Sequence, residues 1–95
     1  MPLKDSLLPI ATKISLTRDD VLALKEIATE HHDENPAFCY TLCIICEHLL
    51  DPWAPDKAQA LIEPIRLFIH SSENQQEYSV DVANTFARIL SSLKN

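Results

Sequence analysis

Glycine is absent from this sequence of 95 residues. Average usage of about 7% would predict six or seven glycines in a chain of this length. Loops that cradle phosphate groups need glycine where backbone amides approach the ligand, so the P-loop and dinucleotide-binding classes are excluded. Tight hairpin turns also lose their favoured residue, which argues against an all-β protein. The absence therefore favours a helical protein without a nucleotide-binding loop.

Positive charge is scarce. Eight Lys and Arg residues face 14 Asp and Glu residues, which gives a formal net charge of −6. Every Lys or Arg stands alone in the sequence, whereas proteins that bind a nucleic-acid backbone cluster their cations. We therefore expect no nucleic-acid partner. The charge is compatible with a basic protein partner.

Long hydrophobic runs are also missing. The longest apolar run without charge, residues 36–46, is too short to span a bilayer. The first 16 residues are interrupted by Pro9 and by polar residues, so they lack the apolar core of a signal peptide. Three cysteines, an odd number, suit a reducing compartment better than a disulfide framework. The sequence predicts a cytoplasmic protein with no membrane segment.

What the sequence does contain is well-marked helices. Thr17 and Asp20 have capping-box spacing, and a one-sided apolar stripe follows them. Asn35 and Pro36 can begin a second helix that runs to about Leu50. Because apolar residues surround most of that helix, we expect it to be the central one.

Two further helices follow in the second half of the chain. One begins near Pro55 and keeps its stripe to residue 69, with a kink expected at Pro64. Ser72 and Gln75 have the spacing of a capping box for the last helix, which runs towards the C-terminus. Residues 1–15 also show helical spacing around Pro9 and can add a short fifth helix.

The predicted fold class is all-α, with four antiparallel helices, or five if residues 1–15 are helical. We expect one domain over residues 1–95, with helical hairpins at 17–50 and 55–93. A weak offset of about forty residues relates the two hairpins and is typical of helical repeats. A bundle and two stacked hairpins explain the pattern equally well.

All three cysteines lie within "FCYTLCIICEHLL", residues 38–50. Their spacing approaches that of radical-SAM iron–sulfur sites, C-x-x-C redox sites and haem attachment sites, and fits none of them. Cys39, Cys43 and Cys46 stand at i, i+4 and i+7 of a predicted helix, so they share one face. Free cysteine packs as a small apolar residue. We interpret them as a buried face that lets a neighbouring helix approach closely, and expect all three thiols to label slowly.

Metal or redox chemistry at the cysteines stays as an alternative. A zinc site could combine Cys39 or Cys43 with His31 or His32, although zinc usually takes four ligands and the sequence offers no second pair. The histidines are better explained as the end of a helix. The serines have no partner base at a recognisable spacing. We therefore predict no enzyme activity, no cofactor and no metal.

Two features remain as candidates for partner binding. Trp53 lies between two prolines and either covers the core or anchors a partner. Carboxylates at helical spacing form a predicted acidic ridge on the last helix, joined by others around the turn after the first predicted helix. The candidate residues are Glu73, Glu77, Asp81, Glu26, Glu30, Asp33, Glu34 and Trp53.

The function that this sequence favours is non-catalytic protein–protein interaction. A small acidic adaptor, a chaperone, or an inhibitor or immunity-type protein would have this size and charge. The alternatives are a metal- or redox-cofactor-binding bundle that uses the cysteines, and a structural or homo-oligomeric helical-repeat component.

Overall fold

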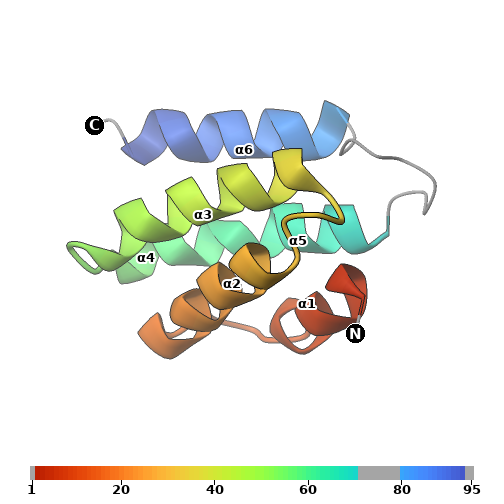
Figure 1. The fold of residues 1–95 in the computed structure, drawn as a ribbon. Coiled ribbons are helices and arrows are strands. Elements are labelled where there is room, and N and C mark those ends of the chain that lie inside the picture. Colours follow the sequence, from red (N-terminus) through yellow and green to blue (C-terminus); the bar gives the residue numbers. More distant parts are fainter. Residues whose placement is uncertain (1, 71–79, 94–95) are drawn as a thin grey trace.

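The computed structural model describes residues 2–70 and 80–93 (Figure 1). These residues form helices and no β-strand, so the predicted all-α fold is confirmed. In chain order the helices are α1 Leu3–Ala11, α2 Arg18–Glu30, α3 Pro36–Leu50, α4 Pro55–Ala58, the 3-10 turn η1 Gln59–Leu61, α5 Ile62–Ile69 and α6 Val80–Leu93.

Helix α3 is the central helix, as predicted. In Figure 1 it lies between α2 and α6, with α4 and α5 beneath it. Phe38 of α3 stacks on Phe68 of α5 with ring centroids 3.9 Å apart, and its ring lies 5.4 Å from that of Phe86 in α6. All three rings are almost fully buried. This aromatic cluster therefore joins three helices that are distant in sequence.

The starts of α2 and α3 follow the predicted capping chemistry. Thr17 and Asp20 form a reciprocal capping box, in which each side chain accepts the other residue's backbone N–H. At α3, the buried Asn35 side chain accepts the Phe38 N–H at 3.2 Å, and Pro36 follows it. Helix α1 confirms the predicted short fifth helix, with Pro9 inside it.

The predicted kink at Pro64 takes the form of a tighter turn. Proline has no N–H, so Pro64 cannot donate to the carbonyl of Ala60 four residues earlier. Ala60 lies in η1, which joins α4 to α5 just before the proline. The predicted capping box at Ser72 and Gln75 lies outside the described residues.

The cysteine-bearing face of α3 packs against α2. The Cys39 thiol donates to the carbonyl of His31 at 3.6 Å, and that of Cys43 to the carbonyl of Lys25 at 3.9 Å. Small side chains allow this approach, as the sequence predicted. In the described part of the chain, no helix combines the length and apolar character that crossing a bilayer requires.

Candidate functional site

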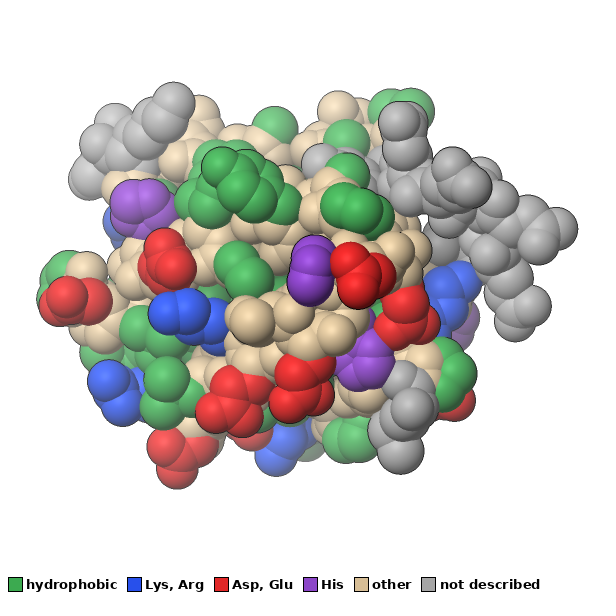
Figure 2. Space-filling view, viewed as in Figure 1, with side chains coloured by type: hydrophobic (Ala, Val, Ile, Leu, Met, Phe, Trp, Pro, Cys, Tyr) green, Lys and Arg blue, Asp and Glu red, His purple; other side chains and the backbone are tan. Residues whose placement is uncertain are grey.

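An acidic face lies on the outer side of α2 and the turn that follows it. We define the acidic face as Glu26, Glu30 and Asp33, all of them exposed. Figure 2 shows acidic side chains over this region, with basic side chains and histidines among them. Asp33 pairs with His32 at 3.1 Å. Within residues 2–70 and 80–93, Glu26 and Glu30 form no ion pair. Two of these carboxylates are therefore available to a partner.

Asp81, the described member of the predicted ridge, does not adjoin this face. Asp81 is exposed in the first turn of α6, and Figure 1 shows α3 between α6 and α2. Glu73 and Glu77 lie outside the described residues. The sequence predicted that these carboxylates and those near α2 form one surface. Among the described residues, Asp81 lies on a different side of α3.

Glu34, also predicted to bind a partner, is engaged within the protein. Its Oε1 accepts the Leu3 N–H at 3.2 Å, and its Oε2 contacts Nδ1 of His31. These hydrogen bonds, that of His31 first, hold the pKa of the Glu34 carboxyl below its usual value. The side chain thus fastens the start of α1 to the turn between α2 and α3.

A serine also reaches this cluster, through a contact that no recognisable spacing in the sequence indicated. Nε2 of His31 lies 3.3 Å from Oγ of Ser6, while its Nδ1 faces Glu34. This is the order of a serine–histidine–carboxylate relay. Ser6 stands 25 residues before His31, so only the packing of α1 against the end of α2 brings them together.

A shallow apolar groove runs between α2 and α3. We call it the α2–α3 groove; its volume is about 380 Å³, and its walls include Thr29 from α2, His32 from the turn after α2, and Pro36, Tyr40 and Cys43 from α3. Tyr40 is 71% exposed, an unusual position for a large aromatic residue. The groove opens beside the acidic face.

Cys43 departs from the prediction that all three cysteines are hidden. Cys39 and Cys46 are fully buried, and burial raises the pKa of their thiols to about 11 and about 12. Cys43 is only half-buried and lines the groove. The reason is its helical angle, because a residue four positions after Cys39 is rotated by about 40° from it.

The geometry gives the cofactor alternative no support. Cys39 and Cys46 are seven positions apart in the helix, a rise of about 10 Å, which is too far for both sulfurs to bind one metal ion. A search of the described residues found no group of three or more His, Cys, Asp or Glu side chains placed to hold a metal. His31 and His32, considered above as alternative zinc ligands, are hydrogen-bonded to other groups.

Trp53 lies at the other end of α3 from the groove. Its side chain is half-buried against the core, in the turn between α3 and α4. The position agrees with the interpretation that Trp53 covers the core. Trp53 does not adjoin the α2–α3 turn.

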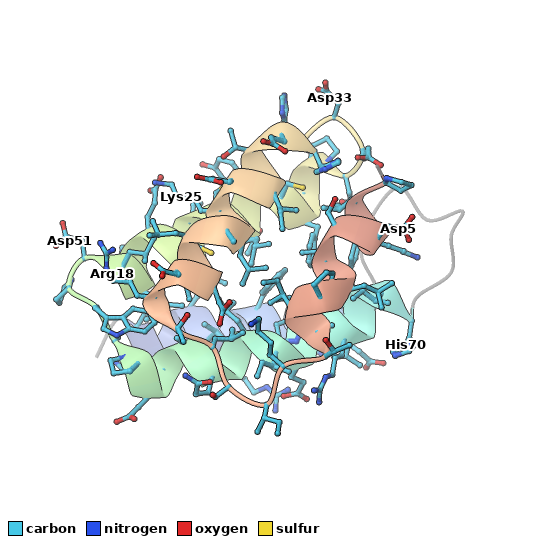
Figure 3. The ribbon with its side chains drawn as sticks, turned by 90° about the horizontal axis from the view of Figure 1, so that it is seen from below. Asp5, Arg18, Lys25, Asp33, Asp51 and His70 are labelled. Carbon is cyan, nitrogen blue, oxygen red and sulfur yellow. The ribbon has the colours of Figure 1, made fainter. Side chains whose placement is uncertain are left out.

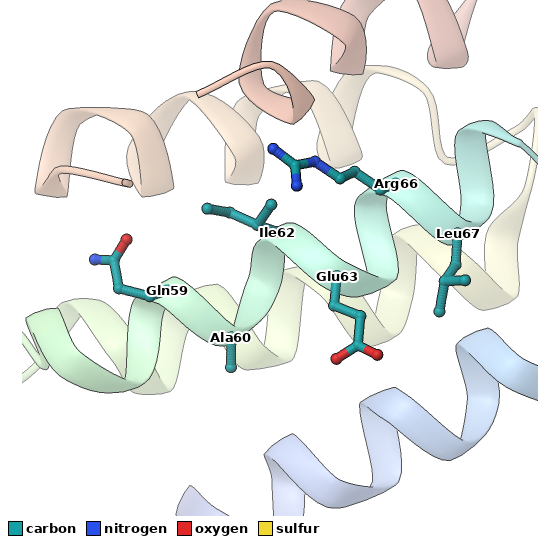
Figure 4. A pocket seen from close by; sticks show the side chains of 6 residues that line it. All are labelled: Gln59, Ala60, Ile62, Glu63, Arg66 and Leu67. Carbon is teal, nitrogen blue, oxygen red and sulfur yellow. The ribbon is translucent and has the colours of Figure 1, made fainter. Parts of the chain in front are cut away.

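A second cleft, of about 430 Å³, lies along α5 (Figure 4). Gln59 Nε2 donates to the Leu16 carbonyl at 2.9 Å, and its Oε1 accepts the Leu16 N–H at 2.6 Å. Arg66 donates from Nε to the Ala11 carbonyl at 2.8 Å and from Nη2 to that of Lys13 at 3.3 Å. These side chains hold the α1–α2 connection against η1 and α5. The sequence gave no reason to single them out.

Comparisons with known proteins found no matching family model, no similar curated protein and no similar solved structure.

Proposed function

We propose that this protein is a non-catalytic interaction module that binds a basic protein partner through the acidic face. The observation that carries the proposal is the exposure of Glu26 and Glu30 without an ion pair in the described part of the chain. An adaptor, a chaperone or an inhibitor would all use such a surface. Carboxylates that face solvent attract cationic partners and accelerate their association.

The net charge of −6 supports the same partner class. A partner rich in Lys and Arg would be drawn to the whole molecule and oriented by the local group of carboxylates. Such attraction between exposed charges weakens with salt, because the Debye length falls from about 10 Å at 0.1 M to about 3 Å at 1 M. Binding through the acidic face should therefore be salt-sensitive.

The test is capture of partners by the immobilised protein from its native cells. In the test variant Glu26→Lys and Glu30→Lys are combined, and in the control Asp51→Lys and Asp56→Lys are combined. Both double reversals change the net charge equally, and Figure 3 shows Asp51 far from Asp33. We expect the test variant alone to lose the partner, by about tenfold or more in affinity. Equal loss in both variants, or in neither, would refute the acidic face as the binding surface.

The Ser6–His31–Glu34 cluster favours a second candidate function, hydrolysis of an activated ester. Ser6 Oγ would attack the acyl carbon while its proton moves to Nε2 of His31, which then gives the proton to the leaving alcohol. Water would release the acyl group in a second step. This function ranks below binding for two reasons. Ser6 lies inside α1 and not on an exposed nucleophile turn. The nearby Leu3 N–H already donates to Glu34, so it is not free to stabilise the oxyanion that would form.

A serine-directed fluorophosphonate and a p-nitrophenyl ester test this second function. Covalent labelling and ester hydrolysis that Ser6→Ala abolishes and His31→Ala reduces would support it. A folded wild-type protein that is neither labelled nor active above the Ser6→Ala variant would exclude it.

A further inference from the structure

We infer that the α2–α3 groove holds one bulky apolar side chain of the partner, within a segment whose neighbouring residues are Lys or Arg. The inference rests on the proposed function and names the part of the partner that is recognised. Four properties of the groove lead to it: its wall, the state of its polar groups, the charges beside it and its size.

The wall of the groove is apolar because small side chains meet there. Ala28 and Thr29 of α2 face Cys39 and Cys43 of α3, so the two backbones pack closely and leave a depression above the contact. Tyr40 stands beside this depression with 71% of its surface exposed. Exposed aromatic residues next to small pockets are typical binding hot spots, since their burial on binding removes a large apolar area from water.

Two polar side chains of the groove, those of Thr29 and His32, are already hydrogen-bonded. The hydroxyl of Thr29 donates to the carbonyl of Lys25 at 2.9 Å, and Nδ1 of His32 lies 3.0 Å from the carbonyl of Thr29. The other ring nitrogen of His32 pairs with Asp33. A polar ligand would have to displace these bonds, whereas an apolar side chain would only displace water. The groove therefore fits an apolar occupant.

Carboxylates lie around the groove. Glu26 and Glu30 lie on α2 and Asp33 in the turn after it, and Glu47 lies on α3 one turn beyond Cys43. Lys25 offsets part of this charge through its ion pair with Glu47, at 3.6 Å. Cations next to the apolar anchor would meet these carboxylates. A second copy of this chain would instead bring the same carboxylates against them, and like charges disfavour that contact.

The size of the groove limits how much of the partner it can hold. Its volume of about 380 Å³ lies near the lower end of the range of 300–1,000 Å³ for ligand pockets. One large side chain with a little adjoining backbone would fill it. Affinity would then depend on this anchor together with the flanking charges, and neither would suffice alone.

The experiment selects short peptides from a random displayed library on the folded full chain, and measures the affinity of the enriched peptides. We expect one Leu, Met or aromatic residue flanked by Lys or Arg. Thr29→Phe, which places a ring over the groove, and Tyr40→Ala should each weaken binding by about tenfold or more. Asn84→Phe, an exposed position on α6, is the matched control and should bind normally.

The outcomes separate this inference from the proposed function. One outcome is the selection of basic peptides without an apolar anchor, which bind wild type and Thr29→Phe equally but do not bind the Glu26→Lys/Glu30→Lys variant. This outcome would refute the groove as a binding site and would leave the acidic face as the proposed binding surface. Enrichment of no peptide would also overturn the inference. Capture of the native partner tests the acidic face independently. Self-association that Thr29→Phe abolishes would assign the groove to a second copy and overturn the basic segment as its occupant.

Discussion

Two concave regions in the described part of the chain differ in what their side chains do. Along α5, Gln59 and Arg66 direct their polar atoms at backbone groups of residues 11–16 and hold that segment in place. In the α2–α3 groove Tyr40 is exposed, and Glu26 and Glu30 beside the groove form no ion pair with any described residue. The hydrogen bonds of the first region are explained by the fold, whereas the exposed groups of the second are not, and this difference is why we propose that a partner binds at α2 and α3.

Energetics give the same contrast. Gln59 satisfies both backbone groups of Leu16, which would otherwise lose their hydrogen bonds. Tyr40 gains little from folding because most of its surface stays in water. An exposed aromatic ring beside an apolar groove is a candidate binding hot spot, which is why we assign Tyr40 to partner binding.

The largest expected effect separates the groove from the core beneath it. A thiol reagent should modify Cys43 rapidly in the native protein. Cys39 and Cys46 should react at a rate at least about a thousandfold lower, because they become accessible only through an opening reaction that approaches global unfolding. Mass spectrometry of partially labelled protein measures this. Cys43→Ala should abolish the fast phase. Labelling of Cys39 or Cys46 at the rate of Cys43 would contradict the described packing.

A second prediction compares one residue from each region. Gln59→Ala should lower the free energy of unfolding by about 1–3 kcal/mol, because it leaves partly buried backbone groups without partners. Tyr40→Ala should change it by less than about 0.5 kcal/mol, as surface substitutions usually do. Urea unfolding followed by circular dichroism measures both. A larger loss for Tyr40→Ala than for Gln59→Ala would reverse the roles given to the two regions.

A smaller effect is expected from pH. The pKa of Asp20 is lowered first by its hydrogen bond from the Thr17 backbone, and that of Glu34 first by His31. Both carboxyls bind a proton more weakly in the folded state than in the unfolded state. The stability that the two ionised carboxylates add to the fold is therefore present above the ordinary pKa values of 3.8 and 4.5, and is lost as pH falls through the lower folded pKa values.

The variant that combines Asp20→Asn with Glu34→Gln should therefore be less stable than wild type at neutral pH, and the difference should shrink below about pH 4. Urea midpoints across this range test it. A difference that stays constant down to acid pH would show that these carboxyls do not contribute through their charge.

Local signals predicted most of the fold. The capping residues Thr17, Asp20 and Asn35 act over three positions, so their hydrogen bonds could be read directly from the sequence. The apolar surround of α3 correctly predicted the central helix. These features depend on neighbours along the chain, for which spacing alone is sufficient evidence.

The candidate site was predicted only in part, because it depends on contacts between distant segments. Gln59 meets Leu16 across 43 residues, and Ser6 meets His31 across 25, and no spacing rule relates such pairs. Glu26, Glu30 and Asp33 were identified, but the groove beside them was not. Tyr40 looked like any helical residue until the packing of α2 on α3 left its ring exposed.

Site-specific photo-crosslinking in the native cell tests the central claim most directly. A benzophenone amino acid would replace Tyr40 at the groove or, as the control, exposed Ala60 in the α5 cleft. We predict adducts with a basic protein from position 40 that disappear when Glu26→Lys and Glu30→Lys are added, and none from position 60. Adducts from position 60 alone, or adducts from position 40 that persist despite the charge reversal, would contradict the account.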